Sequence, residues 1–499
     1  MPLKTSLVRF LLSNRVRAMQ HYATDYETLQ RNTLRKLVRQ ARDTVWGQEH
    51  DYAHIRDYPD FTCRVPVGGY ASLKPYITRM MQGEKDVLWK GVIRRFAHSS
   101  GTSSDTVKII PVSPQGLKRC HLRGGRDVTA SYLHTHPHAR VASGHSLIIS
   151  GSFNKKYSTP RVGDISAIMA DAIPSFFRRI LGFVPSKDAL QIQDFHSKMD
   201  HVLGQALPLN VSSMSGAPDW YLVFLQKALE RKGAHTVEEI WPNLEVFAHG
   251  GMSFDPYRTA YRKLFPSGKI CYIENYNATE GFFGIQTDPS DPAMTLMLDY
   301  EVFYEFLPLN AGENARPLPL WEVETDTDYA LIVSTSSGLW RYNMEDVLRF
   351  TQKAPYKFVL RGRTQQFLNI WGEDLFVQQA DKALAQACAR TGACVVEYTV
   401  APSLDPESGK GFHQWLIEFS QDPPSLPAFE ALLEQCVQEY DFDYQHITAQ
   451  GELASPLQVI VARRGLFYEW MDSRGKLGGQ HKVPRLSSSR KYMDELLSL

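Results

Sequence analysis

Beyond residue 366 the sequence has the pattern of a compact unit, in which helical and strand-like segments follow one another in the order α-β-β-α-β. The periodicity predicts helices at 374–391 and 427–440 and strands at 393–400, 413–419 and 457–462. Residues 367–370 form a candidate opening strand. This order is typical of a split β-α-β unit, which closes a small core of its own. We therefore predict a large N-terminal domain, 1–365, followed by a small C-terminal α+β domain, 366–499.

Within the first 365 residues the pattern changes from alternation to a succession of strands. In the middle of this domain helical segments alternate with short strand-like runs, which is typical of α/β layers. The candidates are helices at 164–181 and 219–232 and strands at 146–150, 244–248 and 269–274. The later strand candidates lie at 295–306, 320–324 and 329–335. Because these follow one another directly, we expect an antiparallel, barrel-like section within an α/β fold.

The charge balance limits the kind of partner that the chain can attract. Its 499 residues include 55 Lys+Arg and 54 Asp+Glu, which gives a net charge of +1. Such a chain has no overall field for nucleic acid or an anionic membrane, and no apolar run approaches the roughly 18 residues of a membrane helix. We therefore expect small-molecule substrates, no nucleic acid partner and no membrane insertion. The six cysteines are scattered without a C-x-x-C pair, which indicates reduced thiols and a cytoplasmic protein.

The N-terminus allows two interpretations. Residues 1–24 contain four basic side chains and no acidic one, which is the composition of a mitochondrial transit peptide. Apolar side chains at helical spacing nevertheless lead into a second helical stretch that contains Asp25 and Glu27. The apolar residues of this stripe are Leu7, Leu11, Leu12, Val16 and Met19. We favour a structural first helix built on the stripe.

The run 99–108, SSGTSSDTVK, follows a strand-like segment and is a candidate phosphate-binding loop. Its amide and hydroxyl donors can surround phosphate oxygens while the ammonium group of Lys108 neutralises their charge. The loop differs from that of P-loop NTPases, because the second glycine and the Gly-Lys pair are missing. On composition alone, such a run is more often a surface turn. The candidate ligands are Ser99, Ser100, Gly101, Thr102, Ser103 and Lys108.

Two further motifs contain carboxylates near strand ends. In the run 276–281, YNATEG, Thr279 and Glu280 follow a strand-like segment, and such oxygen ligands suit a Mg²⁺ ion that bridges phosphates. In the run 338–347, GLWRYNMEDV, Asp346 can accept hydrogen bonds from both hydroxyls of a ribose. An exposed acidic turn explains the second run equally well.

Two basic segments are the fourth and fifth candidate motifs. They are 361–363, RGR, and 479–486, GQHKVPRL, and the second contains Lys482. In order and spacing, the five motifs resemble the ANL adenylating superfamily, which includes acyl-CoA synthetases, peptide-synthetase adenylation domains and luciferases. They are most similar to the acyl acid amido synthetases, the auxin-responsive family that conjugates auxin or jasmonate to amino acids. The chain is shorter than the plant members and resembles the microbial branch.

The resemblance implies an AMP-forming ligase that uses ATP and Mg²⁺. Such an enzyme adenylates a carboxylic acid, releases pyrophosphate and transfers the acyl group to an amine, which in this family is an amino acid. By this resemblance, the 99–103 loop and Lys108 bind the phosphates, and Thr279 and Glu280 bind Mg²⁺. Adenine lies against Gly250, Gly251 and Tyr276. The ribose is bound by Asp346 and Arg363. In the superfamily a lysine of a mobile C-terminal domain swings over the α-phosphate, and Lys482 matches it. The implied catalytic residues are Lys482, Glu280 and Lys108.

The third motif departs from the family pattern Tyr-Arg-x-Gly-Asp. Tyr342 and Asp346 match it, whereas Asn343 and Glu345 replace the arginine and the glycine. A glutamate adopts a positive φ at a higher cost than glycine. Either the turn differs here or Glu345 is strained.

Two other functions remain open at this stage. An acyl-CoA ligase shares the first half-reaction, and a non-catalytic nucleotide sensor would keep the fold without the chemistry. The retention of Lys108, Glu280, Asp346 and Lys482 argues against the sensor, because a decayed site loses its charged residues first. The histidines at 134, 136 and 138 are not predicted to bind a metal, since no cysteine or carboxylate cluster completes the set. The identity of the acid and of the amine, and the oligomeric state, stay open.

Overall fold

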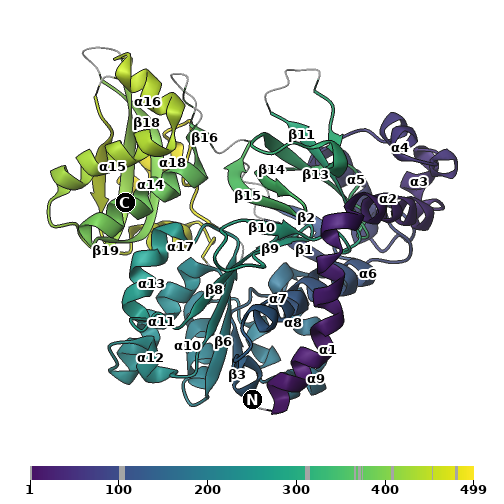
Figure 1. The fold of residues 1–499 in the computed structure, drawn as a ribbon, viewed down its shortest axis with the longest axis horizontal. Helices are drawn as coiled ribbons and strands as arrows, with labels where there is room; N and C mark the ends of the chain where they lie inside the picture. The colour runs from purple at the N-terminus through teal and green to yellow at the C-terminus, as the bar shows by residue number, and fades with distance from the viewer. Residues whose placement is uncertain are drawn as a thin grey trace.

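The computed structural model describes residues 3–99, 107–309, 315–364, 367–368, 373, 375–405, 410–451, 453, 455–477 and 482–499. One twelve-stranded sheet runs through the larger part of the molecule (Figure 1). In sheet order its strands are β12 (Leu318–Pro319), β11 (Val302–Pro308), β13 (Asp328–Thr335), β14 (Tyr342–Lys353), β15 (Tyr356–Arg363), β10 (Met294–Leu296), β9 (Phe282–Ile285), β8 (Cys271–Asn277), β7 (Val246–Gly250), β6 (Val211–Gly216), β3 (His145–Ile148) and β5 (Phe183–Val184).

The sheet has a parallel half and an antiparallel half that meet at β8. Strands β5, β3, β6, β7 and β8 pair in parallel, whereas β8 pairs with β9 in antiparallel fashion. All further pairings from β9 to β12 are antiparallel. The predicted α/β class and the antiparallel character of the later strands are thus confirmed. The barrel-like shape of that section stays a prediction.

Helices surround this sheet. The helices of the larger part are α1 (Leu3–Gln20), α2 (Tyr22–Ala41), α3 (Val45–Glu49), α4 (Tyr58–Arg64), α5 (Tyr70–Met81), α6 (Pro114–Gly116), α7 (Leu122–Thr135), α8 (Ile165–Ala172), α9 (Ser175–Leu181), α10 (Phe195–Ala206), α11 (Pro218–Lys232), α12 (Val237–Ile240) and α13 (Arg258–Leu264). Helices α10, α11 and α13 share an apolar core with the parallel strands, to which Phe224, Phe247 and Tyr261 contribute. No helix among the described residues is long and apolar enough to cross a bilayer.

Two expected elements differ from the structure. The single helix predicted at 164–181 is divided into α8 and α9, because Pro174 lacks an N–H group and disfavours helical geometry at Ile173, whose backbone is extended. The strand predicted at 320–324 is a short 3-10 helix, η6 (Leu320–Glu322), behind the two-residue strand β12. A proline directly precedes the new element in both places: Pro174 precedes α9, and Pro319 precedes η6.

A separate three-stranded sheet carries the first motif. Strand β1 (Arg95–Ser99) lies between β2 (Lys108–Pro111), which is antiparallel to it, and β4 (Arg161–Asp164), which is parallel to it. Helix α8 starts directly after β4. Ser99 and Lys108, the ends of β1 and β2, therefore lie side by side at one end of this small sheet.

The C-terminal part contains the predicted order of elements. It consists of α14 (Val377–Thr391), β18 (Cys394–Leu404), β19 (Gly411–Gln421), α15 (Leu426–Tyr440), α16 (Phe442–Ala449), β20 (Gln458–Ala462), α17 (Leu466–Ser473) and α18 (Lys491–Leu497), with the short strands β16 (Phe367–Leu368) and β17 (Leu375–Phe376) ahead of α14. β19 pairs with β18 in antiparallel fashion and with β20 in parallel. The predicted boundary at Gln366 lies outside the described residues, and the division into two domains stays a prediction.

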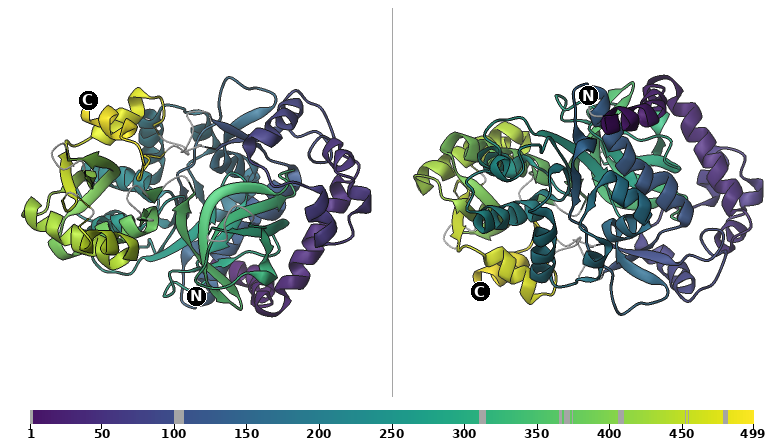
Figure 2. Two further views of the ribbon diagram at one scale, coloured as in Figure 1. Left: turned by 90° about the horizontal axis from the view of Figure 1, so that it is seen from above. Right: turned by 90° about the horizontal axis from the view of Figure 1, so that it is seen from below.

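The C-terminal part rests on one edge of the larger part (Figures 1 and 2). Helix α14 contacts η5 (Asp255–Tyr257) and α13, and β18 contacts η5 as well. The ammonium group of Lys263 donates a hydrogen bond to the carbonyl of Gly392 at 3.2 Å. These contacts hold the C-terminal part against η5, which follows β7 in the chain.

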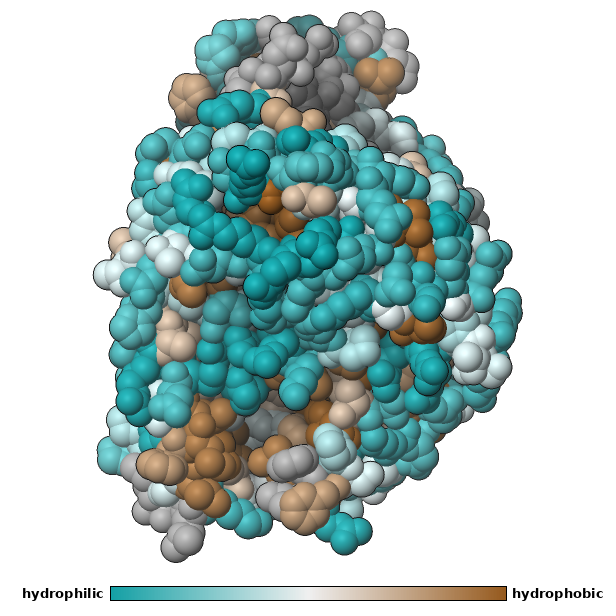
Figure 3. All heavy atoms as spheres, turned by 90° about the vertical axis from the view of Figure 1, so that its right-hand side faces the viewer, coloured by the Kyte–Doolittle hydropathy of each residue, from teal (hydrophilic) through white to brown (hydrophobic). Residues whose placement is uncertain are grey.

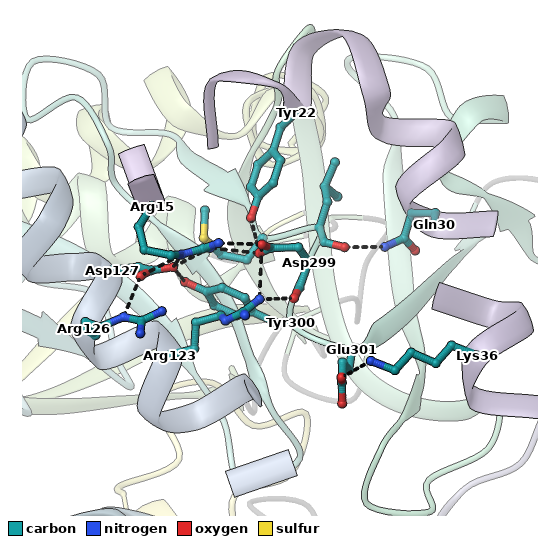
Figure 4. Close-up of polar contacts among 12 residues, drawn as sticks. Arg15, Tyr22, Gln30, Lys36, Arg123, Arg126, Asp127, Asp299, Tyr300 and Glu301 are labelled. Carbon is teal, nitrogen blue, oxygen red and sulfur yellow. Dashed lines mark hydrogen bonds and ion pairs between the residues drawn. The ribbon is translucent and has the colours of Figure 1, made fainter. Parts of the chain in front are cut away.

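The predicted first helix is confirmed as α1, and a buried ion-pair cluster holds it. The Arg15 guanidinium group pairs with Asp127 of α7 at 2.7 Å and with Asp299 at 2.6 Å, and the Tyr22 hydroxyl donates to Asp299 (Figure 4). Asp127 also accepts a hydrogen bond from the hydroxyl of Tyr300 at 2.9 Å. Because Asp127 is fully buried, its charge is compensated by these partners.

The buried side of α1 matches the predicted stripe only in part. Leu12 is buried, and Val8, Val16 and Met19 pack against the same core. Leu7 and Leu11 are instead exposed by 58% and 65%. Figure 3 shows a largely hydrophilic face with hydrophobic residues gathered towards its lower end, the end of the molecule at which α1 begins in Figure 1.

Candidate functional site

The ends of neighbouring strands bring the predicted site residues together. β7 and β8 are parallel neighbours, with Gly250 opposite Asn275, so the turn after β7 lies beside the end of β8. β14 and β15 form a hairpin in which Asp346 lies opposite Arg363. The carboxyl ends of the parallel strands β7 and β8 lie at the same edge of the sheet. The hairpin meets the end of β8 there, since the Tyr276 hydroxyl donates a hydrogen bond to Asp346.

Asp346 is the centre of a small polar network. Its Oδ1 forms an ion pair with Nε of Arg363 at 3.0 Å, and its Oδ2 accepts a hydrogen bond from the Tyr276 hydroxyl. Burial and the charge of Asp346 raise the pKa of Tyr276 well above its ordinary value, so the tyrosine stays a donor. The carboxylate is held in one orientation, and each oxygen keeps acceptor capacity for a further hydroxyl group.

Thr279 and Glu280 follow β8 and are buried. The Thr279 hydroxyl donates to the carbonyl of His98 in β1 at 3.1 Å, which joins the second motif to the strand that leads into the first. Burial, together with the charge of Asp346, raises the pKa of the Glu280 carboxyl to about 7. An anionic Glu280 is therefore stabilised by neighbouring cations, and the charges of Arg363 and Lys108 act in this direction.

The first motif is described only at its two ends. Ser99 ends β1, Lys108 begins β2, and the two lie opposite each other in the sheet. The Lys108 ammonium group lies 3.4 Å from Oε2 of Glu345. The predicted ligands Ser100, Gly101, Thr102 and Ser103 lie outside the described residues.

Gly250 and Gly251 leave open space beside the site. A Cβ atom on Gly250 would lie 2.2 Å from the carbonyl oxygen of Asn275, so no other residue fits there without a backbone shift. Gly251 has a φ of 89°, and a Cβ atom on it would lie 3.6 Å from Nζ of Lys482. A side chain at Gly251 would therefore fill the space into which Lys482 reaches.

Lys482 comes from the far end of the chain and lies at the site. Its side chain is partly buried next to Gly251. Burial lowers the pKa of Lys482, while the negative charges of Asp219 and Asp346 oppose this shift. An alternative in which Lys482 is one more solvated charge of a basic tail does not fit this position.

The structure adds Asp219, which the sequence analysis did not identify. It lies in the first turn of α11, where its Oδ1 accepts a hydrogen bond from the backbone N–H of Trp220 at 2.8 Å. Burial raises the pKa of Asp219, and the charges of Lys482 and Arg485 act in the opposite direction. In the sequence, Asp219 is notable only because it follows Pro218. This pattern predicts the start of a helix and does not point to a ligand-binding residue.

The third motif is strained at the position where it departs from the family pattern. Glu345 has a φ of 64°, in the left-handed region. Its backbone N–H donates to Oδ1 of Asn343 at 2.9 Å, and its carbonyl accepts from the N–H of Thr364 at 2.8 Å. The turn is therefore kept without glycine, and Asn343, the second departure, helps to hold it.

The site combines cations and carboxylates in one buried place. Lys108, Arg363 and Lys482 can neutralise phosphate oxygens, and Asp346 can accept ribose hydroxyls. The described residues contain no cluster of three or more His, Cys, Asp or Glu side chains that could hold a metal ion. A metal held by Thr279 and Glu280 would need phosphate oxygens to complete its shell, as Mg²⁺ commonly does.

Comparison with known families covers almost the whole chain. The model of the GH3 family N-terminal domain matches residues 15–207 and 168–270, that of the central domain matches 295–363, and that of the C-terminal domain matches 378–491. The chain belongs to the GH3 family. The resemblance noted from the five motifs is thereby confirmed at the level of the family.

Relatives within the GH3 family are plant enzymes. Indole-3-acetic acid-amido synthetase GH3.4 of Arabidopsis thaliana is 23% identical over 93% of this chain and 89% of its own length. Indole-3-acetic acid-amido synthetase GH3.8 of Oryza sativa subsp. indica is 25% identical over 94% and 90%. These names do not support the predicted microbial branch.

Solved structures share the fold. The acyl acid amido synthetase AtGH3.15 in complex with 2,4-DB has a TM-score of 0.78 at 19% identity, with 97% of this chain and 95% of that chain covered. 2-Hydroxyisobutyryl-CoA ligase in the postadenylation state has a TM-score of 0.59 at 12% identity, with 95% and 92% covered. The GH3 chain therefore has the fold of adenylating ligases.

Proposed function

We propose that this GH3 protein is an ATP-dependent acyl acid amido synthetase. A carboxylate attacks the α-phosphorus of ATP, which gives an acyl adenylate and pyrophosphate. An amine, which we propose to be an amino acid, then attacks the acyl carbon and releases AMP. The observation that carries the proposal is the position of Lys482, which comes from the C-terminal part to lie beside Gly251 and within the field of Asp346.

The nucleotide would lie between the two parts of the protein. Lys108 and the 99–103 loop would bind the β- and γ-phosphates, and Asp346, positioned by Arg363 and Tyr276, would accept the ribose hydroxyls. Gly250 and Gly251, with Tyr276, would leave room for adenine. A Mg²⁺ ion, with Thr279 and Glu280 at its side, would supply charge neutralisation on the phosphates.

Lys482 would act on the adenylation step. Negative charge builds between the attacking carboxylate and the α-phosphate in the transition state, and a preorganised ammonium group stabilises it there more than in the ground state. We propose that the small C-terminal domain, 366–499, moves after this step and lets the amine enter. Such a motion would also shield the acyl adenylate from water before transfer.

The acyl and amine substrates are proposed as classes only. The walls of an acyl pocket would include α8, which packs against the small sheet that carries the first motif. We also propose a microbial source, on the ground of chain length, and therefore do not assign indole-3-acetic acid to this protein. A mass-spectrometric screen with ATP, pooled carboxylic acids and pooled amino acids tests the function directly.

Pyrophosphate exchange separates the three functions. Acid-dependent exchange between ATP and pyrophosphate is expected from a ligase and is incompatible with a nucleotide sensor. An amido synthetase is expected to form an amide when an amino acid is the acceptor. It is expected to form no thioester when CoA is supplied in place of the amino acid, whereas an acyl-CoA ligase forms one. Thioester formation at a comparable rate would contradict the proposed acceptor.

Replacement of Asp346 by asparagine is expected to raise the KM for ATP by about 10- to 100-fold. A charge-assisted hydrogen bond contributes roughly 1.5 to 3 kcal/mol, and an amide accepts with one oxygen where the carboxylate offers two. The matched control is Asp328→Asn, because Asp328 pairs with Arg349 at 2.6 Å on the same antiparallel half of the sheet without a proposed nucleotide contact. Equal KM values for the two variants would show that Asp346 does not bind the ribose.

A further inference from the structure

Glu345 occupies a backbone position that costs free energy. A residue other than glycine in the left-handed region is destabilised by about 1 kcal/mol or more. Two hydrogen bonds hold the backbone of Glu345 there, one to the Asn343 side chain and one from Thr364. Glu345 keeps its side chain although its backbone conformation costs free energy. Asn343, which replaces the arginine of the family pattern, supports that conformation. The contacts of the Glu345 carboxylate indicate the role of this side chain.

The Glu345 carboxylate lies between two cations of the candidate site. Its Oε2 is 3.4 Å from Nζ of Lys108 and 3.7 Å from Nη2 of Arg363. The Glu345 side chain is 26% exposed, whereas that of Lys108 is only 14% exposed. Attraction at these distances is substantial where solvent is partly excluded. Glu345 therefore compensates the positive charge of Lys108, whose side chain is largely buried.

Asp346 cannot replace Glu345 in this task. Its two oxygens are directed to Arg363 and Tyr276. In the family pattern the position of Glu345 is a glycine, which offers no charge to Lys108. The presence of this carboxylate distinguishes the chain from that pattern at the place where the phosphates of a nucleotide would lie.

We propose that Glu345 is an internal counter-ion that pairs with Lys108 and Arg363 and competes with the phosphates of ATP for them. The inference rests on the proposed function, since it requires a nucleotide in this site. A phosphate group must displace the carboxylate, so Glu345 lowers the affinity for phosphate-bearing ligands. On departure of pyrophosphate the carboxylate returns to Lys108, which favours release.

Equilibrium binding of ATP and of adenosine to the full-length protein tests the proposal. Glu345→Gln removes the charge at nearly constant size, and Glu345→Gly restores the family residue. Both variants are expected to bind ATP about 3- to 10-fold more tightly than the wild-type protein. Their affinity for adenosine, which carries no phosphate, is expected to stay unchanged.

Two comparisons separate charge from backbone strain. Glu345→Gly also relieves the positive φ and is expected to raise the melting temperature, whereas Glu345→Gln is not. The control is Asp326→Gly, because Asp326 is an exposed carboxylate with a φ of 60°. This variant is expected to share the gain in melting temperature without any change in ATP affinity.

The outcomes distinguish the inference from the proposed function. Unchanged ATP affinity in both Glu345 variants would overturn the inference. Weaker ATP binding would also overturn it, since it would mean that Glu345 holds Lys108 in a productive position. A wild-type protein that binds neither ATP nor adenosine would instead remove the proposed function itself, and the inference with it.

Discussion

Replacement of Lys482 by alanine is expected to lower the rate of acyl adenylate formation by about two to three orders of magnitude. Removal of one preorganised donor from a transition state has an effect of this size. The Kd for ATP is expected to change only a few-fold, because the ribose and phosphate contacts remain. Acid-dependent pyrophosphate exchange measures the rate, and equilibrium binding measures the Kd.

The second half-reaction supplies the internal control for Lys482. A preformed acyl adenylate is expected to react with the amine at close to the wild-type rate, because its α-phosphate has already lost the pyrophosphate. Lys232→Ala, at an exposed position near the end of α11, controls for loss of a surface charge. Wild-type pyrophosphate exchange in Lys482→Ala would assign catalysis to Lys108 or to another residue.

The C-terminal part was predictable because its local signals agree. Helix α15 begins after Ser425, whose side chain accepts a hydrogen bond from the N–H of Ala428, and Pro427 lies in its first turn. The strands are rich in apolar residues and bury Val395, Trp415 and Phe419. Capping, proline placement and burial all favour the same elements there.

The N-terminal helix was predictable only in part. Apolar residues lie on both sides of α1, so periodicity alone could not choose the buried side. The choice depends on Arg15, whose pairing with Asp127 and Asp299 orients the helix. Partners separated by more than a hundred residues leave no mark in local spacing.

At the candidate site too, residues within local motifs could be predicted from the sequence, whereas contacts between distant segments could not. Tyr276, Glu280 and Asp346 stand out because each belongs to a short polar motif. Asp219 has no such context, and its proximity to Lys482 results from how the C-terminal part rests on the larger part. The left-handed backbone of Glu345 was expected as one of two possibilities, but the pairing of its carboxylate with Lys108 was not.

Replacement of Arg485 by alanine is expected to destabilise the protein by about 3 to 5 kcal/mol, because the side chain is buried with two carboxylates. Nη1 of Arg485 donates to Oδ1 of Asp381 at 2.7 Å, and Nε donates to Oε1 of Glu397 at 3.2 Å. Burial raises the pKa of Glu397 to about 7 although Arg485 lowers it, so loss of the guanidinium group leaves this carboxylate still harder to ionise. Chemical denaturation measures the change.

The same side chain also links the two parts of the protein, since Nη2 of Arg485 donates to the hydroxyl of Tyr257 in η5 at 2.7 Å. Adding Asp381→Asn and Glu397→Gln to Arg485→Ala is expected to recover part of the lost stability, because no buried charge is then left unpaired. Arg463→Ala, which breaks an exposed pair with Glu469, is expected to cost less than about 1 kcal/mol. If Arg485→Ala were no more destabilising than Arg463→Ala, the buried cluster would not hold the C-terminal part in place, and Lys482, three residues earlier in the chain, would need another anchor at the site.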